Sequence, residues 1–366
     1  MPIPGWAWCP GRKGGGVDLQ VHSDRQDDIG RIRVANPARP IFAALDLGTN
    51  NCRLLVARPT LGGYRVIDAF SRIVRLGEGV CRTERLSDPA MARALSALRV
   101  CGAKIRRRGV TAVRAVGTEA CRRAVNCGEF VDAVERETGI AIEIITSQEE
   151  GRLALVGCAP LLDASHPYAL IFDIGGGSTE LMWLAVEPGG RPRILDQVSV
   201  RCGVIGLTEQ YGGDRIDRAT YRRMLDEVAD AIEPFEARND IRSRMEAGEV
   251  QLLGTSGTVT TLAGIHLGLP RYDRRLVDGS FLRVDHARAV IRRLLALDFC
   301  GRAAHPCIGT ERADLVIGGC AVLEAICDCW PAERLRIADR GLREGILVEL
   351  MGSVPAALGT RQDHGR

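Results

Sequence analysis

The chain has 366 residues, of which 46% are hydrophobic and 26% are charged, and its formal net charge is +3. This length and composition are typical of a soluble globular protein with room for two domains. The weak net charge gives no support for nucleic acid as a partner, and we expect none. Lys13 and Lys104 are the only lysines, so arginine carries nearly all of the positive charge. A GC-rich genome produces that bias, but arginine also matches phosphate oxygens in a bidentate way.

The 13 cysteines are scattered along the chain, and no CxxC spacing occurs. This pattern indicates reduced thiols and argues against a disulfide framework or a structural zinc site. No apolar run reaches the roughly 18 residues that a membrane span needs, and the N-terminus has no apolar core of the signal-peptide type. We therefore expect a cytoplasmic protein that does not bind a membrane.

Residues 1–38 are rich in Gly, Pro, Arg and Asp and show no helical or strand period. They predict a disordered N-terminal tail, or else a start site assigned too far upstream. The folded part is expected to form one lobe over 39–163 and a second lobe over 164–355. The last residues, 356–366, predict a loose C-terminal tail.

Folded structure is expected to begin with a buried strand over 41–45, a turn that carries Asp46, and a returning strand in the letters "CRLLVA". After further strand material, Ser87 followed by a proline and, later, Gly109 mark the start and the end of a long helix. Two strand-to-helix steps follow, in "VTAVRAVGTEACRRAVN" and in "IAIEIITSQEEGRLALVGCA". Strands and helices therefore alternate, which is typical of the α/β class.

The opening pattern occurs a second time, in "YALIFDIGGGSTELMWLAV". Asp173-Ile174-Gly175 matches Asp46-Leu47-Gly48, and apolar strands flank both turns. The later segments again read as a long helix near 217–239, a strand with a glycine-rich turn and a helix, and a final helix, strand, glycine turn and helix. The repeat predicts two related lobes, each of which opens with a hairpin whose turn carries an aspartate.

The second of these turns has the composition of a phosphate site. Three consecutive glycines, Gly175 to Gly177, leave backbone N–H groups accessible to phosphate oxygens, and Ser178 and Thr179 add hydroxyl donors. Asp173 ends the preceding strand, where a carboxylate can hold Mg²⁺ against the phosphates. The alternative is a tight hairpin that needs its glycines for geometry alone.

Other residues suggest parts of the same site. Gly257 lies in a third glycine-bearing turn, which leads into a helix N-terminus that favours anions. Arg53 and Arg122 follow strand ends and can clamp phosphates. Glu149 and Glu150 open a predicted helix, where acids are common, although one of them can instead orient and deprotonate a water molecule. No GxxxxGK[ST] motif occurs, so a P-loop enzyme is excluded.

Seven blocks of the sequence together carry a family resemblance: "ALDLGTNNCRLLVA", "RIVRLGEG", "GTEACRRAVN", "IITSQEEGRLA", "FDIGGGSTEL", "LLGTSGTVTTLAG" and "DRGLREGIL". In this order they resemble the exopolyphosphatase / guanosine pentaphosphate phosphohydrolase family, the Ppx/GppA phosphatases, in its two-domain short form. The resemblance covers roughly residues 40–352. It implies two ribonuclease H-like lobes of the actin, sugar-kinase and heat-shock ATPase superfold with a cleft between them, in agreement with the internal repeat.

The resemblance also implies an activity, a cofactor and roles for single residues. The implied reaction is hydrolysis of the terminal phosphate of inorganic polyphosphate or of guanosine pentaphosphate, assisted by Mg²⁺ or another divalent cation such as Mn²⁺, with water as the in-line nucleophile. The implied catalytic residues are Glu150 and Glu180, the implied metal-binding residues are Asp173 and Asp46, and the implied phosphate-binding residues are Gly175, Gly176, Gly177, Ser178, Thr179, Thr49, Asn50, Arg53, Arg122 and Gly257.

Two features depart from the family pattern. Asn51 stands where many relatives have serine, so that a hydroxyl contact there is absent. The sequence ends soon after "DRGLREGILVELM", without the additional helical domains of longer members, and this argues against processive action on very long chains.

Alternatives of other classes remain open from the sequence. One alternative is an ATP-dependent kinase of small molecules on the same superfold, and another is an actin-like scaffold that uses nucleotide as a switch. Polyphosphate and guanosine pentaphosphate both present a terminal phosphoanhydride, so the sequence does not separate them. A homodimer is the expected assembly, because dimers are the commonest one.

Overall fold

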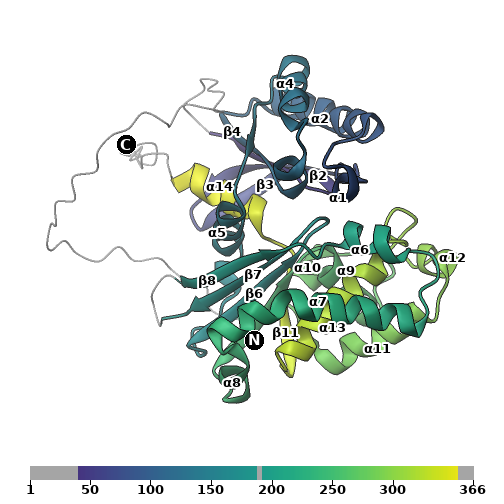
Figure 1. Ribbon diagram of the computed structural model, residues 1–366. Coiled ribbons are helices and arrows are strands. Elements are labelled where there is room, and N and C mark those ends of the chain that lie inside the picture. The colour runs from purple at the N-terminus through teal and green to yellow at the C-terminus, as the bar shows by residue number, and fades with distance from the viewer. Residues whose placement is uncertain (1–39, 188–191, 353–366) are drawn as a thin grey trace, which may run out of the picture.

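The structure, a computed structural model, describes residues 40–187 and 192–352. The expected tails over 1–38 and 356–366 lie outside these residues. Figure 1 shows two lobes, one above the other, each built from a sheet and packed helices. Within the described residues, no helix combines the length and the apolar composition needed to cross a membrane.

The first lobe is built on a mixed sheet of five strands in the order β3-β2-β1-β4-β5. Strands β1, β2 and β3 are antiparallel neighbours, and β4 and β5 extend the sheet in parallel with β1. Alternate residues of β1 and β2 form one core with α2 and α4 on one face of the sheet. The bounds are β1 Phe42–Leu47, β2 Asn51–Thr60, β3 Gly63–Ile73, α1 Val80–Thr83, α2 Asp88–Arg108, β4 Ala112–Gly117, α3 Glu119–Arg123, α4 Cys127–Thr138, β5 Ile142–Ile144, α5 Ser147–Cys158 and the 3₁₀ turn η1 Ala159–Leu161.

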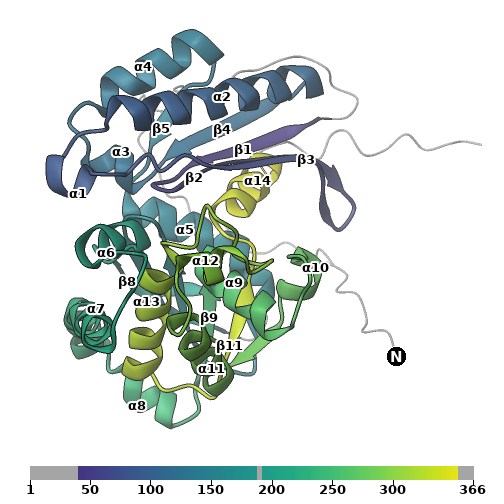
Figure 2. The same cartoon turned by 90° about the vertical axis from the view of Figure 1, so that its right-hand side faces the viewer.

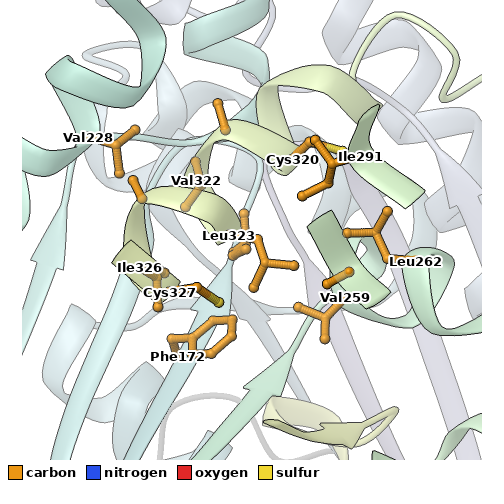
Figure 3. Close-up of a cluster of buried hydrophobic side chains, with 14 of the residues drawn as sticks. Phe172, Val228, Val259, Leu262, Ile291, Cys320, Val322, Leu323, Ile326 and Cys327 are labelled. Atoms are coloured by element: carbon orange, nitrogen blue, oxygen red, sulfur yellow. The ribbon is translucent and has the colours of Figure 1, made fainter. Parts of the chain in front are cut away.

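The second lobe is built on a sheet of six strands in the order β10-β11-β9-β6-β7-β8. Its large core lies between one face of this sheet and the helices α7, α9, α11 and α13, and Figure 3 shows Phe172 of β6 against Leu323 and Ile326 of α13. The bounds are β6 Tyr168–Ile174, β7 Thr179–Ala185, β8 Arg193–Val200, α6 Val204–Tyr211, α7 Arg218–Asn239, α8 Ile241–Glu246, β9 Val250–Thr255, α9 Gly257–His266, α10 Arg274–Val277, β10 Phe281–Arg283, α11 Val284–Leu295, α12 Phe299–Ala303, α13 Val316–Cys329, β11 Arg334–Ala338 and α14 Leu342–Gly352.

The two sheets share one topology, which confirms the fold that the internal repeat predicted. β6, β7 and β8 are antiparallel like β1, β2 and β3, and β9 and β11 extend the second sheet in parallel like β4 and β5. Among the described residues the second sheet has one added strand, β10, which lies antiparallel to β11 at the edge. Paired α/β lobes of this kind are the architecture of the actin, sugar-kinase and heat-shock ATPase superfold. The repeat places Asp46 and Asp173 at equivalent positions, one at the C-terminal end of each first strand.

The local signals for α2 act as the sequence predicted. The side chain of Ser87 accepts a hydrogen bond from the backbone N–H of Ala90, and a proline occupies the first turn. Gly109 ends the helix in the left-handed conformation, with φ of 60°. These caps fix both ends of a long helix that covers the first sheet.

Two helices are exchanged between the lobes. Apolar residues of α5 pack on the second sheet, around Met182 and Leu253, while Ile346 and Leu347 of α14 pack on the first sheet beside Ala44. Figure 2 shows α14 on the side of the first sheet opposite α2 and α4. The packing of α14 therefore corrects the expected second-lobe range of 164–355, because its apolar face is buried in the first lobe.

The exchanged helices touch along their backbones, because glycines face the contact. A Cβ atom on Gly345 of α14 would lie 1.9 Å from the carbonyl oxygen of Leu153, and one on Gly157 of α5 would lie 2.1 Å from that of Gly341. Real Cβ atoms do not approach backbone so closely, so either helix would have to move. The close contact holds the middle and the C-terminal end of α5 against α14.

We expect Gly345→Ala to lower the free energy of unfolding by about 1–3 kcal/mol, the usual cost of overpacking, or by more if α14 cannot shift. Thermal unfolding followed by circular dichroism measures the effect. Gly352→Ala is the matched control on the same helix, because a Cβ atom there meets nothing within 4 Å. Equal melting temperatures for the two variants would contradict the proposed role of the contact.

Candidate active site

A cleft of about 730 Å³ opens between the lobes, at the ends of the central strands. The turn after β1 lines it from one side and the glycine turn after β6 from the other. All of the predicted site residues line this cleft except Thr179 and Arg122. Those that do are Asp46, Thr49, Asn50, Arg53, Glu150, Asp173, Gly175, Gly176, Gly177, Ser178, Glu180 and Gly257.

The turns of the two lobes lie against each other. A Cβ atom on Gly176 would lie 3.0 Å from the backbone nitrogen of Asn50, and one on Gly177 would lie 3.0 Å from the hydroxyl of Thr49. Glycine is therefore needed for close approach, as the tight-turn alternative expected. Among the described residues, however, no acceptor takes the N–H groups of Gly176 or Gly177. These two donors remain available to an anion at the cleft.

Asp46 and Asp173 lie in the cleft without partners. Within the described parts of the chain, neither carboxylate forms a hydrogen bond or an ion pair. Burial raises the pKa of both, and for Asp173 burial and then the nearby Glu180 raise the pKa to about 7. Arg53 opposes the shift in each case. The site thus holds negative charge that the protein itself compensates only in part.

These two carboxylates fit a divalent cation. Mg²⁺ is commonly bound by one or two carboxylates, with water molecules and substrate phosphates completing its shell. The oxygen donors of Asp46 and Asp173 suit that arrangement, and an ion held by them would supply the missing positive charge. The residues that the structure describes contain no cluster of three or more His, Cys, Asp or Glu side chains able to hold a metal alone.

The structure separates the roles of the two glutamates that begin α5. Glu149 faces outward and is paired with Arg114 at 2.9 Å and with Arg152 at 2.7 Å, and these contacts lower its pKa. Glu150 faces the cleft. Burial first, and then repulsion by Glu180, raise the pKa of Glu150 well above its ordinary value, against the opposing effect of Arg122. Glu150 is therefore the member of the pair that can act as a base toward a molecule in the cleft.

Glu180 and Thr179 are held by the protein. The hydroxyls of Ser178 and Ser199 donate to one carboxylate oxygen of Glu180, at 2.5 and 2.9 Å. The pKa of Glu180 is nevertheless raised, because burial outweighs these hydrogen bonds. The hydroxyl of Thr179 donates to the carbonyl of Cys202 at 2.6 Å and is fully buried. Thr179 thus supports the turn and does not reach the cleft.

Three arginines face the cleft without an ion pair among the described residues: Arg53, Arg312 and Arg343. The guanidinium groups of Arg53 and Arg312 converge on the N-terminus of α9, where a Cβ atom on Gly257 would lie 3.9 and 3.5 Å from them. Burial lowers the pKa of Arg343, and Arg53 adds to the effect. Free arginines beside a helix N-terminus form a strong site for phosphate.

Arg312 and Arg343 were missed by the sequence reasoning. Arg343 lies in the first turn of α14 after a strand end, which is the same signal that singled out Arg122. Arg312 lies in a loop without any such signal. The loop is held to the first lobe by Arg75, whose two terminal nitrogens each lie 2.8 Å from a carboxylate oxygen of Asp314.

Arg122 does not take the position expected of a phosphate ligand. Its guanidinium donates to Glu119 at 3.0 and 3.1 Å, to Glu150 at 2.8 Å and to the carbonyl of Ile145 at 3.0 Å. These acceptors surround it, and it does not line the cleft. Glu119, which the sequence reasoning did not select, does line the cleft.

The buried carboxyl groups predict an unusual pH dependence for the metal-free protein. Asp173 has an ordinary pKa of 3.8 when unfolded and about 7 when folded, so the folded state binds more protons between these values. Stability should therefore fall as the pH rises from 5 to 8, by up to about 1.4 kcal/mol per pH unit for each such group. Thermal unfolding in a chelating buffer tests this, and Mg²⁺ should flatten the slope. A melting temperature that rises over this range would refute the prediction.

Comparison with known proteins identifies relatives. A model of the Ppx/GppA phosphatase family matches residues 55–354. Guanosine-5'-triphosphate,3'-diphosphate pyrophosphatases of Photobacterium profundum and Aeromonas hydrophila subsp. hydrophila are both 28% identical to the chain, over 87% and 86% of its length. The alignments cover 61% and 60% of those proteins, so the chain spans about three fifths of the curated relatives that it matches.

Solved structures share the fold along nearly their whole length. An exopolyphosphatase-like protein is 28% identical with a TM-score of 0.77, and the alignment covers 86% of this chain and 98% of that one. A Ppx/GppA enzyme of Aquifex aeolicus is 27% identical with a TM-score of 0.69, over 85% and 99%. Since the family model spans most of the folded residues, the chain belongs to the Ppx/GppA phosphatase family.

Proposed function

We propose that the chain hydrolyses the terminal phosphoanhydride bond of guanosine pentaphosphate or inorganic polyphosphate and releases orthophosphate. The observation that carries the proposal is the position of Glu150. Its carboxylate faces a cleft that also holds two unpartnered aspartates, free glycine N–H groups and three unpaired arginines. The names of the relatives, which cover both substrates, support the same reaction class.

In the proposed mechanism, the terminal phosphate binds at the glycine turn. The N–H groups of Gly176 and Gly177 donate to its oxygens, and Arg53 offsets charge that develops on them. Glu150 accepts a proton from the attacking water, which lies in line with the bond that breaks. Asp46 and Asp173 would hold a divalent cation such as Mg²⁺ or Mn²⁺, which when bound withdraws negative charge from the phosphate oxygens.

The remaining phosphates of the substrate are proposed to lie along the arginines. Arg312 and Arg343 face the same cleft as Arg53, and Gly257 begins α9 between Arg53 and Arg312. Bidentate contacts from these groups would fix the phosphate chain while its end reacts. Such a site serves both substrates, because both present a chain of phosphates at the reacting end.

The proposal also includes the location of the protein in the cell and its oligomeric state. Each cysteine in the described ranges is a free thiol, which fits the reducing environment expected of the cytoplasm. The expected homodimer stays a prediction, which sedimentation of the purified chain would test.

Phosphate release by the purified protein with Mg²⁺ tests the function. Polyphosphates of several lengths, guanosine pentaphosphate and ATP are assayed in parallel. Release from polyphosphate or from guanosine pentaphosphate, but not from ATP, is the expected result. Transfer of phosphate from ATP to an added small-molecule acceptor would instead favour a kinase, and nucleotide-dependent sedimentation without turnover would favour a scaffold.

A further inference from the structure

The side chain of Arg122 forms a bridge between two glutamates, Glu119 and Glu150, at the rim of the cleft. Both donors of its Nη1 atom are used, one by the carbonyl of Ile145 at 3.0 Å and one by a carboxylate oxygen of Glu150 at 2.8 Å. Its Nε and Nη2 atoms both donate to one oxygen of Glu119, at 3.1 and 3.0 Å. Four of the five N–H donors of a guanidinium are therefore engaged.

These hydrogen bonds leave few N–H donors of Arg122 free for a substrate phosphate. The side chain of Arg122 is 17% exposed, and it does not line the cleft. A phosphate could reach the guanidinium only by displacing the carboxylates of Glu119 or Glu150, which are themselves anions with charge-assisted hydrogen bonds. By contrast, Arg53, Arg312 and Arg343 face the cleft without such partners. The phosphate-binding role expected for Arg122 is therefore better filled by these three.

The bridge also fixes how Glu150 is presented. Arg122 holds Oε2 of Glu150 and, through the carbonyl of Ile145, the backbone that leads into α5. Among the described residues, no donor contacts the other oxygen, Oε1. One oxygen is thus fixed while the other is left to accept a proton from a molecule in the cleft.

We propose that Arg122 and Glu119 are positioning residues for Glu150: Arg122 orients its carboxylate, and Glu119 holds Arg122 in place. The inference rests on the proposed function, in which Glu150 is the base. Glu119 begins α3 directly after β4, and its Cγ lies 3.1 Å from where a Cβ on Gly177 would be. The bridge therefore links the base to the wall of the phosphate site.

The charges around Glu150 predict opposite effects for the two positioning residues. Glu180 from β7 and Asp46 from β1 repel its charge, and Arg122 from α3 attracts it. Loss of Arg122 should move the acidic limb of the kcat–pH profile to higher pH. Loss of the charge of Glu119 should move that limb to lower pH, because Glu150 then no longer shares the positive charge of Arg122 with a second carboxylate.

Arg122→Gln and Glu119→Gln test the inference on the full chain, with polyphosphate and guanosine pentaphosphate as probes. For Arg122→Gln we expect kcat at pH 7 to fall about 10²-fold, the scale of a misplaced catalytic group, with KM changed less than about threefold. Arg122→Lys keeps the charge but cannot make the bridge, so it should lower kcat with a smaller shift of the acidic limb.

Three results would overturn the inference. The first is a large rise in KM with kcat unchanged in Arg122→Gln, which would make Arg122 a phosphate ligand. The second is a shift of the acidic limb in the same direction for both variants. The third is unchanged kinetics in both. If Arg122→Gln does not fold, as judged by circular dichroism, Glu119→Gln alone decides through the direction of its shift.

A readout without turnover separates this inference from the proposed function. Carboxyl ¹³C NMR of the metal-free protein follows the ionisation of Glu150, assigned by its loss in Glu150→Gln. The titration should move to higher pH in Arg122→Gln and to lower pH in Glu119→Gln. A wild-type protein that releases no phosphate from either probe would refute the proposed function, whereas a failure of these opposite shifts would refute the bridge.

Discussion

Replacement of Glu150 by glutamine is expected to lower kcat by about 10²–10⁴-fold, the usual contribution of a positioned general base. The reason is that glutamine cannot accept a proton from water at neutral pH. The fold should be preserved, because the amide oxygen can still accept the hydrogen bond that Arg122 donates at 2.8 Å. The melting temperature of the metal-free protein should stay the same or rise, since a buried carboxylate with a raised pKa is removed. Steady-state phosphate release and thermal unfolding measure both effects.

Glu149 provides the matched control on the same turn of α5. Glu149→Gln removes a charge from a partly exposed network with Arg114 and Arg152. Its cost in stability should stay near 1 kcal/mol or less, as for most exposed ion pairs, and turnover should be retained. Loss of turnover in Glu149→Gln together with normal turnover in Glu150→Gln would reverse the assignment of the base.

Much of the fold follows from local sequence signals. The caps of α2 lie at Ser87 and Gly109, where the sequence placed them. The repeated turn allowed Asp46 to be matched with Asp173, and the shared strand order confirms that match. These features depend on residues close together in the chain. For the same reason, the sequence could assign a phosphate site to the glycine turn before any contact between the lobes was known, whereas the cleft was implied only by the family resemblance.

Other features depend on contacts that no local pattern encodes. The exchange of α5 and α14 between lobes is set by packing of Gly157 and Gly345 against backbone far away in the chain. Thr179 follows the glycines in sequence, yet the pleat of β7 turns its hydroxyl to Cys202 and away from the cleft. Arg312 lies in a loop without any local sequence signal, which an ion pair between Asp314 and Arg75 ties to the other lobe. Sequence position alone therefore gives the turns of the site but not its full set of cations.

The choice between the two glutamates of α5 likewise depends on contacts that the local sequence does not encode. Sequence spacing puts Glu149 and Glu150 in one helical turn, and both suit its N-terminus. Only the position of α5 between the sheets decides which side chain meets the cleft and which meets Arg114 and Arg152. Arg152 and Arg114 lower the pKa of Glu149, whereas burial first, and then Glu180, raise the pKa of Glu150. Opposite shifts of this kind are the usual mark of a functional carboxylate beside a structural one.

Asp173→Asn is expected to have opposite effects on activity and on stability. Loss of a carboxylate that would hold the divalent cation should lower kcat/KM at least about 10²-fold, because a bound metal contributes several kcal/mol to the transition state. The Mg²⁺ concentration for half-maximal activity should rise as well. In chelating buffer at pH 8, however, the variant should melt at a higher temperature than the wild type, because the pKa of Asp173 in the fold, about 7, shows that its charge is unfavourable there.

Asp196→Asn is the control for these opposite effects on activity and stability, since it makes the same substitution on β8 of the same sheet. The carboxylate of Asp196 accepts hydrogen bonds from Arg238 and Asn239, and its pKa is lowered. This variant should lose a little stability and keep its Mg²⁺ dependence. A carboxylate kept for structure loses stability when it is neutralised, and one kept for a metal gains stability while activity falls. If Asp173→Asn were less stable than the wild type at pH 8 without metal, with normal Mg²⁺ dependence, Asp173 would have to be a structural residue and the metal site would lie elsewhere.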